Sequence, residues 1–310
     1  MPSENPSTSR NWGADSALNQ TLPVSTFNLD GPTRAIDRRI HAFRPDIADV
    51  ALAGTLFAPH YAAPMPRAAA AAAFMRSAPS ASAEAVSQLL PGEGFAALEI
   101  TAGWAWGYSL HDHYVGYIEV AHLCDPVAPT HRVSVREALI FSEASIKAPI
   151  AGTRPIGSRL CGAVEGNFLK IDGGFVHMRH VAPVDDLAAD PVAVAELCLG
   201  MPYLWGGRGG DGIDCSGLVQ IALAAAGHSA PRDTDMQRQE IGFALDEHAP
   251  LRRGDIVSFP GHVGLMVDEE RLIHANAHWM AVVIEPLADV VARLKPNHDR
   301  PILSRRRLTA

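Results

Sequence analysis

The chain has 310 residues, of which 47% are hydrophobic, so it is long enough to bury two or three domain cores. Its net charge of −8 argues against nucleic acid as a partner, because Lys and Arg must neutralise the phosphates in such complexes. No segment approaches the ~20 apolar residues that cross a bilayer, so we expect no membrane span. The basic run at 305–307 is short, and we expect a solvated tail there.

Residues 1–34 are rich in Ser, Asn, Pro and Thr and lack hydrophobic periodicity, which predicts a disordered N-terminal segment. They also lack the positive patch and the run of about 7–15 apolar residues of a secretory signal, so the sequence favours a cytoplasmic location. The four cysteines form no C-x-x-C pair, which fits free thiols in a reducing compartment.

Two blocks in the middle of the chain carry an imperfect repeat. G-Y-I-E-V-A-H-L at 116–123 aligns with G-F-V-H-M-R-H-V at 174–181. Each copy follows short β-like runs separated by Gly and Asp, a pattern typical of small β-barrels. Pro-rich stretches at 125–129 and 182–191 bound the blocks, so we expect barrels over 35–124 and 130–183. The Ala-rich run 68–73 prefers helix locally, but we place it as a strand that enters the first barrel.

The last block, 186–310, has a different pattern. Asp190 and Pro191 suit the N-cap and first position of a helix, and Gly200 ends its apolar run. A second helix is predicted from Cys215 to Ala226. Helices followed by antiparallel strands predict an α+β domain, and the β-like segments here lie at 255–259, 262–267, 271–275 and 282–285.

Cys215 lies at the start of the second predicted helix, after a glycine-rich loop in which Asp214 is a natural N-cap. A helix N-terminus favours an anion, so we expect the thiol pKa to fall below its usual value of about 8.5, with help from an adjacent imidazolium. The same N–H groups can hold an oxyanion. The other three cysteines, Cys124, Cys161 and Cys198, lack such neighbours and are interpreted as structural thiols.

Two downstream histidines lie in strand-like segments. Alternation places His262 on one face with Gly264 and Met266, which leaves room for a substrate. His274 is close enough in sequence to lie on the neighbouring strand, and a base oriented by a third polar group is the usual way to activate a nucleophile. His274 and His278 also have i, i+4 spacing, but their β-like context and the lack of H-E-x-x-H argue against zinc. We therefore expect no metal and no cofactor.

Six segments, in this order, resemble the NlpC-type cell-wall peptidases, which are papain-like cysteine enzymes that cut murein peptides. They are P-Y-L-W-G-G at 202–207, D-C-S-G at 214–217, P-R-D-T at 231–234, R-G-D-I at 253–256, G-H-V-G at 261–264 and H-A at 274–275. Their combination is specific, although no single segment is. The repeated β blocks resemble the bacterial SH3-like barrels that often precede this domain, although the run 68–73 departs from the usual β-branched first strand. The resemblance implies an α+β, papain-like peptidase domain after two small SH3-like β-barrels.

The resemblance also implies roles for individual residues. Cys215 would be the nucleophile, His262 the base and His274 the orienting third member. The Tyr203 hydroxyl and the backbone N–H of Cys215 would together donate hydrogen bonds to the oxyanion. Substrate-binding positions are expected around them: Asp233 for a substrate ammonium, Thr234 next to it, Trp205, Asp214 and Ser216 in the groove, and Tyr114 of the first barrel at the end of the groove.

The implied partner is a murein-derived stem peptide with a free N-terminal L-Ala. It would be cut between γ-D-Glu and the diamino acid, commonly meso-diaminopimelate, in cell-wall recycling. One alternative keeps the fold and makes the protein an amidase or acyl transferase, since acyl-enzyme chemistry is shared. The other is a non-catalytic murein-binding protein, against which the complete set of Cys215, His262 and His274 speaks. The sequence indicates neither the preferred stem-peptide length nor the oligomeric state.

Overall fold

The computed structural model describes residues 36–309, so the predicted disordered segment 1–34 lies outside the described residues. Within 36–309, each helix is too short or too polar to span a bilayer. The chain begins with β1 (Ile47–Asp49), the 3-10 turn η1 (Val50–Leu52) and β2 (His60–Ala62), and β1 and β2 pair in parallel. The Asp49 side chain caps η1 by accepting a hydrogen bond from the Ala51 amide.

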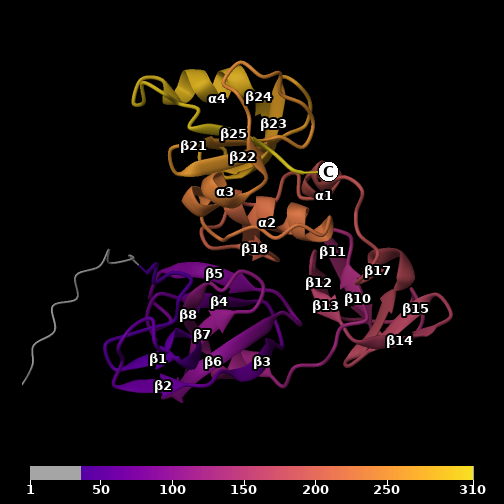
Figure 1. The fold of residues 1–310 in the computed structure, drawn as a ribbon. Coiled ribbons are helices and arrows are strands. Elements are labelled where there is room, and N and C mark those ends of the chain that lie inside the picture. Colours follow the sequence, from indigo (N-terminus) through magenta and orange to yellow (C-terminus); the bar gives the residue numbers. More distant parts are fainter. Residues whose placement is uncertain (1–35, 310) are drawn as a thin grey trace, which may run out of the picture. The chain divides into compact units, whose positions relative to one another are not determined.

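The first β domain is an antiparallel sheet with the strand order β5-β4-β8-β7-β6-β3-β9 (Figure 1). Alternation of buried and partly exposed residues along β8 explains why its sequence forms a strand with one face on the core. The strands are β3 (Met65–Ala69), β4 (Ala73–Arg76), β5 (Ala85–Leu89), β6 (Gly94–Thr101), β7 (Trp104–Ser109), β8 (Val115–Glu119) and β9 (Leu123–Cys124), with the 3-10 turn η2 (Val120–His122) before β9.

The Ala-rich run 68–73 is not one strand. It forms the end of β3 and the first residue of β4, with a bend between them. Ala68, Ala69 and Ala73 are buried, because their small side chains fit where the two strands turn over the core. Tertiary packing therefore overrides the local helical preference of alanine.

The second β domain consists of a sheet with the order β13-β10-β17 and a sheet with the order β12-β11-β16-β15-β14, both antiparallel. Its core includes the buried side chains of Ile140, Leu169 and Val176. The strands are β10 (His131–Val133), β11 (Glu137–Phe141), β12 (Ile150–Pro155), β13 (Arg159–Leu160), β14 (Gly162–Glu165), β15 (Phe168–Ile171), β16 (Gly174–His177) and β17 (Val181–Pro183), with the 3-10 turn η3 (Met178–His180) before β17.

The two copies of the sequence repeat have the same local structure. In each, a strand leads through a 3-10 turn into a second strand, β8-η2-β9 in one and β16-η3-β17 in the other. The residues before the turns have nearly the same backbone angles, φ −66° and ψ 129° at Glu119 and φ −67° and ψ 134° at His177. The second strand of each copy pairs with the first strand of its own sheet, β9 with β3 and β17 with β10.

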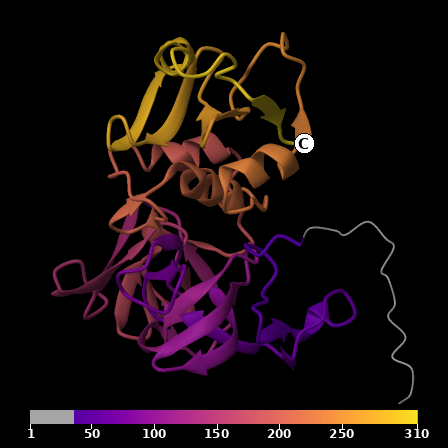
Figure 2. The same ribbon diagram turned by 90° about the vertical axis from the view of Figure 1, so that its left-hand side faces the viewer.

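The C-terminal domain has a six-stranded antiparallel sheet with the order β20-β25-β21-β22-β23-β24. Helices α1 and α2 pack on each other, and α2 lies against β22 and β23 (Figures 1 and 2). The helices are α1 (Pro191–Glu196), α2 (Cys215–Ala225), α3 (Thr234–Glu240) and α4 (Leu287–Leu294). The strands are β18 (Arg208–Gly209), β19 (Gly212–Ile213), β20 (Phe243–Ala244), β21 (Ile256–Phe259), β22 (His262–Met266), β23 (Arg271–Asn276), β24 (Ala281–Pro286) and β25 (Ser304–Arg307).

The basic run at 305–307 was expected to be a solvated tail, and this prediction is wrong. It forms most of β25, which pairs with β20 and β21 inside the sheet. The charge is tolerated because Arg307 forms an ion pair with the buried Asp255, with Nε 2.7 Å from Oδ1. Arg306 meanwhile donates to the carbonyl oxygens of Arg238 and Gly242.

Candidate active site

The loop before α2 is held by Asp214. Its carboxylate accepts hydrogen bonds from the amides of Gly217 (2.8 Å) and Gly206 (2.9 Å), so one side chain both caps the helix and closes the loop. Position 217 requires glycine, because a Cβ there would lie 2.4 Å from the carbonyl oxygen of Gly207. The loop thereby places Cys215 at the first position of α2.

The Cys215 side chain is only 5% exposed. Its sulfur accepts hydrogen bonds from the backbone amides of Ser216 and Val263, and the second contact brings strand β22 next to the thiol. Burial and the Asp214 carboxylate together raise the thiol pKa to about 12, although Arg232 and the two amides act in the opposite direction. The predicted fall of this pKa is therefore wrong for the free protein, because burial and the capping carboxylate outweigh the helix dipole. The resting group is a neutral thiol.

A chain of hydrogen bonds leads from His262 into the sheet. His262 Nε2 lies 2.7 Å from His274 Nδ1, and His274 Nε2 lies 2.8 Å from Glu285 Oε1. Arg293 pairs with the Glu285 carboxylate, and this arginine together with His274 holds the Glu285 pKa below its usual range against the effect of burial. Glu285 is therefore an ionised acceptor.

This series of hydrogen bonds determines the tautomers of both histidines. Because ionised Glu285 only accepts, His274 Nε2 must donate to it. The Nδ1 atom of neutral His274 then accepts from His262 Nε2–H, which leaves His262 Nδ1 with a free lone pair. That nitrogen is therefore free to accept a proton. His274 thus orients His262, and Glu285 orients His274.

Both rings are held in the neutral state. Burial lowers the pKa of His262 to about 3, and the neighbouring His274 lowers it further. Burial also lowers the pKa of His274, although Glu285 opposes that shift. A neutral imidazole next to a neutral thiol is a general base that has not yet received its proton.

The depressed His262 pKa predicts a loss of stability in acid. The unfolded chain binds a proton at His262 near pH 6.5 and the folded chain near pH 3, so stability is complete above about pH 6.5 and falls as the pH drops toward 3. Between pH 7 and pH 4.5 we expect His262 to account for about 2 kcal/mol of the free energy of unfolding. Urea unfolding at both pH values should therefore show a smaller acid loss in His262→Gln than in the wild type. The exposed His248, changed to Gln, is the matched control, and equal losses in all three proteins would contradict the prediction.

Arg232 holds the two residues that flank Cys215, Asp214 and Ser216. Its guanidinium is almost fully buried and pairs with the Asp214 carboxylate, and Nη1 donates to Ser216 Oγ at 2.7 Å. Nε donates to Ser87 Oγ on β5 at 3.1 Å. The side chains of Asp214 and Ser216 are thus committed to protein partners, and the first β domain helps to hold the start of α2.

A cavity of about 250 Å³ is lined by both Cys215 and Asp233. Six of the ten site residues expected from sequence line it together with Cys215, namely Tyr114, Trp205, Asp214, Ser216, Asp233 and Thr234. Trp205 is 59% exposed, and its Nε1 donates to Glu84, which belongs to the first β domain and lines the same cavity.

Asp233 lies at the end of this cavity among charged groups. Its Oδ2 accepts hydrogen bonds from the Tyr114 hydroxyl (3.0 Å) and from Arg39 Nη1 (2.8 Å). Arg39 also pairs with Asp37 and Asp235. Three carboxylates around one guanidinium leave this end of the cavity with net negative charge.

The remaining three predicted residues, Tyr203, His262 and His274, are not among the lining residues of the cavity. Gly261, the residue before His262, lines the cavity, and the amide of Val263, the residue after it, contacts the Cys215 sulfur. The Tyr203 pKa is raised to about 12, first by burial and then by the neighbouring Cys215, so the phenol lies near the sulfur.

Four residues that contact the predicted site residues were not predicted from the sequence, namely Arg39, Glu84, Arg232 and Glu285. Glu285 had a detectable signal, since it is the one charged residue in the apolar strand β24 and shares a face with His274. Arg232 looks like part of a surface turn between Pro231 and Asp233. Arg39 and Glu84 reach the site only through contacts with residues more than a hundred positions away.

The chain matches two domain families. Residues 200–293 match the NlpC/P60 family, and residues 75–123 match the bacterial dipeptidyl-peptidase Sh3 domain. The gamma-D-glutamyl-L-lysine dipeptidyl-peptidase of Bacillus subtilis (strain 168) is 32% identical over 129 residues, which cover 38% of this chain and 43% of that protein. Dipeptidyl-peptidase 6 of Lysinibacillus sphaericus is 37% identical over 87 residues, covering 27% of this chain and 31% of that protein. The chain thus spans less than half the length of these curated relatives.

A solved structure has the same fold over most of the chain. The crystal structure of an NlpC/P60 family protein from Bacillus cereus ATCC 10987 superposes with a TM-score of 0.66 and 19% sequence identity, and covers 79% of this chain and 100% of that one. At this identity the similarity shows the fold alone. The two family matches and this superposition agree, and the chain carries an NlpC/P60 domain of papain-like fold preceded by a bacterial Sh3 domain.

Proposed function

We propose that this chain is a cysteine peptidase of murein-derived peptides. It hydrolyses the bond between γ-D-Glu and the diamino acid in stem peptides that have a free N-terminal L-Ala. The observation that carries the proposal is the single cavity that joins the Cys215 thiol to the acidic end at Asp233. The printed names of the relatives, a gamma-D-glutamyl-L-lysine dipeptidyl-peptidase and a dipeptidyl-peptidase, support the same substrate class.

The proposed reaction begins with transfer of the Cys215 proton to His262 Nδ1. The sulfur then attacks the γ-carbonyl carbon of D-Glu, and the oxyanion is held by the Cys215 backbone N–H and the Tyr203 hydroxyl. His262 returns the proton to the amine of the leaving diamino acid, and the C–N bond breaks to give a thioester. His262 next takes a proton from water, whose hydroxide attacks the thioester carbonyl. The C–S bond breaks to release L-Ala-γ-D-Glu, and His262 returns the proton to the sulfur, which restores the Cys215 thiol and the neutral imidazole. The pair of Glu285 and His274 stabilises the His262 cation while it exists.

The acidic end of the cavity accounts for the requirement of a free amine. An ammonium group that enters this partly closed space loses water and needs a carboxylate partner. Asp233 provides one, and Tyr114 and Arg39 hold its carboxylate in place. Thr234 and Trp205 line the path between this end and the thiol, whereas Asp214 and Ser216 position the helix.

Asp233→Asn should raise KM for the free tripeptide about 10–100-fold, because a hydrogen bond to a charged group contributes about 1.5–3 kcal/mol. We expect kcat to change little, since the carboxylate lies away from the reacting atoms. Steady-state kinetics with L-Ala-γ-D-Glu-meso-diaminopimelate would measure both constants. The N-acetylated tripeptide is the control, and the mutation should not change kcat/KM for this blocked substrate. An unchanged KM for the free peptide would refute the role of Asp233.

Incubation with defined tripeptides tests the function itself. We expect mass spectrometry to detect L-Ala-γ-D-Glu and the free diamino acid from the meso-diaminopimelate peptide, the L-lysine peptide or both. The comparison of the two peptides also identifies the preferred third residue. Cleavage at another bond, or intact peptides after extended incubation, would rule out this reaction.

The proposal extends to the organisation of the chain. We divide it into the segment 1–34, a first SH3-like barrel with its N-terminal extension at 35–124, a second SH3-like barrel at 130–183 and the peptidase domain at 186–310. The shared strand–3-10–strand repeat supports the assignment of the second barrel. A site built for a charged amine selects peptides that are already released, which supports a role in cell-wall recycling in the cytoplasm.

A further inference from the structure

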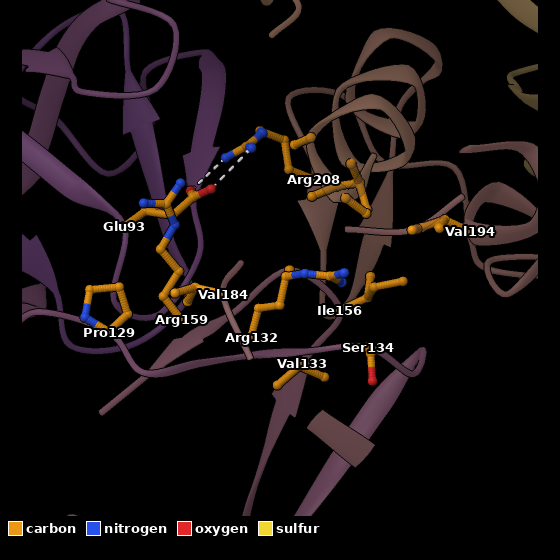
Figure 3. A pocket seen from close by; sticks show the side chains of 15 residues that line it. Glu93, Pro129, Arg132, Val133, Ser134, Ile156, Arg159, Val184, Val194 and Arg208 are labelled. Atoms are coloured by element: carbon orange, nitrogen blue, oxygen red, sulfur yellow. Dashed lines mark hydrogen bonds and ion pairs between the residues drawn. The ribbon is translucent and has the colours of Figure 1, made fainter. Parts of the chain in front are cut away.

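A second cavity, of about 470 Å³, shares no lining residue with the Cys215 cavity. Its wall comes from the turn after β5, the second β domain with the segments that flank it, helices α1 and α2, and strand β18 (Figure 3). Its volume lies within the range of about 300–1,000 Å³ that is typical of ligand pockets. The proposed peptidase reaction leaves this space unused.

Positive charge exceeds negative charge around the cavity. The side chains of Arg132, Arg159 and Arg208 surround it, and Glu93 is the single carboxylate in the wall (Figure 3). Arg208 is only 1% exposed, and two of its nitrogens bind Glu93 at 2.6 and 3.1 Å. That pair neutralises one arginine and leaves two positive charges.

The arginines have unused donors. Within the part of the chain that the structure describes, the buried Nε atoms of Arg132 and Arg208 have no hydrogen-bond partner. Arg132 Nη2 donates a hydrogen bond to the backbone carbonyl oxygen of Asp186, an uncharged acceptor. Burial lowers the pKa of the Arg132 guanidinium. Burying a guanidinium without a charged partner is unfavourable, and an anion in the cavity would offset that cost at Arg132.

The rest of the wall is largely apolar. Val133, Ile156, Val184, Val194 and Ile221 lie in it, and Ala224 and Ala225 form its floor on α2. An inorganic ion would leave this surface in contact with water. The combination of guanidinium donors and an apolar wall fits a ligand that has both an anionic and an apolar part.

We propose that this cavity binds a small amphipathic oxyanion, with its carboxylate or phosphate at Arg132 and Arg159 and its apolar part against Ile156 and Ile221. The site is separate from the Cys215 cavity and does not depend on the peptidase reaction. Either oxyanion satisfies the same donors, so n-octanoate and n-octyl phosphate serve as two probes that distinguish the two classes.

Isothermal titration calorimetry with the full chain tests the proposal. We expect at least one of the two probes to bind, and octan-1-ol and inorganic phosphate to bind at least 10-fold more weakly than that probe. The double variant Arg132→Gln/Arg159→Gln should weaken binding of the probe at least 10-fold. Ala224→Phe keeps every charge and fills the cavity, so it should also weaken binding. The exposed Arg179 lies outside the cavity, and Arg179→Gln is the matched control with wild-type affinity.

The outcomes separate this site from the peptidase site. Cys215→Ala should bind the probes with wild-type affinity, whether or not the chain cleaves murein peptides. The proposal is wrong if neither probe binds, if octan-1-ol or inorganic phosphate binds as tightly as the probes, or if the double variant and Ala224→Phe both bind like the wild type. Thermal unfolding of each variant confirms that any loss of binding occurs in a folded protein.

Discussion

Replacing Cys215 by alanine should lower kcat for the tripeptide by about 10⁴-fold or more, because no other group in the cavity can form the thioester. Alanine removes only the sulfur atom, and the helix cap at Asp214 remains intact. The variant should therefore still bind the peptide with an affinity close to that of the wild type. Mass-spectrometric product analysis and calorimetric peptide binding would measure the two properties independently.

The combination of lost hydrolysis and retained binding distinguishes the enzyme from a murein-binding protein. Cys161→Ala is the control. The sequence predicted a buried structural thiol at this position, and that prediction is wrong, because Cys161 is exposed on the second β domain. Its loss should therefore leave hydrolysis unchanged. Residual hydrolysis by Cys215→Ala at more than a few per cent of the wild-type rate would exclude Cys215 as the nucleophile. If the wild type itself binds without cleaving, the non-catalytic alternative holds.

Arg232→Met should destabilise the protein by about 3–5 kcal/mol, because it leaves the buried Asp214 carboxylate without its ionic partner. The guanidinium also joins Ser87 of the first β domain to Ser216 of the catalytic helix. We therefore expect the melting temperature to fall by about 6 °C or more. Peptidase activity should fall as well, because Asp214 both caps α2 and closes the loop before Cys215.

Two further variants test whether the unpaired Asp214 charge causes the loss of stability in Arg232→Met. Arg253→Met removes a guanidinium that forms exposed ion pairs with Glu196 and Asp190. It should lower the free energy of unfolding by less than about 1 kcal/mol. Adding Asp214→Asn to Arg232→Met removes the unpaired charge and should recover part of the lost stability. Equal melting temperatures for Arg232→Met and Arg253→Met would contradict this account.

The local features of the peptidase domain could be predicted because they depend on nearby residues. Asp214 was predicted as an N-cap with Cys215 at the start of a helix, and the structure has both. The spacing of His262 and His274 predicted neighbouring strands, and β22 and β23 do pair, with His262 Nε2 2.7 Å from His274 Nδ1. Caps, glycine turns and alternating strands act over a few residues, so sequence patterns report them directly.

The thiol pKa could not be predicted in the same way. The helix dipole is a property of the local sequence, but burial of the sulfur under β22 depends on how the helix packs on the sheet. Burial is the largest contribution to the shift, and it has the opposite sign to the dipole. The same limit applies to 305–307, whose charges are accepted inside a sheet only because Asp255 lies beside them.

By itself, the sequence determined the helix that begins at Cys215, the two strands that carry His262 and His274, and the β-rich character of the two repeated blocks, because short-range backbone preferences produce them. The tertiary structure alone decided that Glu285 orients His274, that Arg232 holds Asp214, and that Arg39 and Tyr114 meet at Asp233. The first two contacts form only when α2, β23 and β24 pack within the peptidase domain, and the contacts at Asp233 also need earlier parts of the chain. The interactions that offset the burial of these charges therefore exist only in the folded structure.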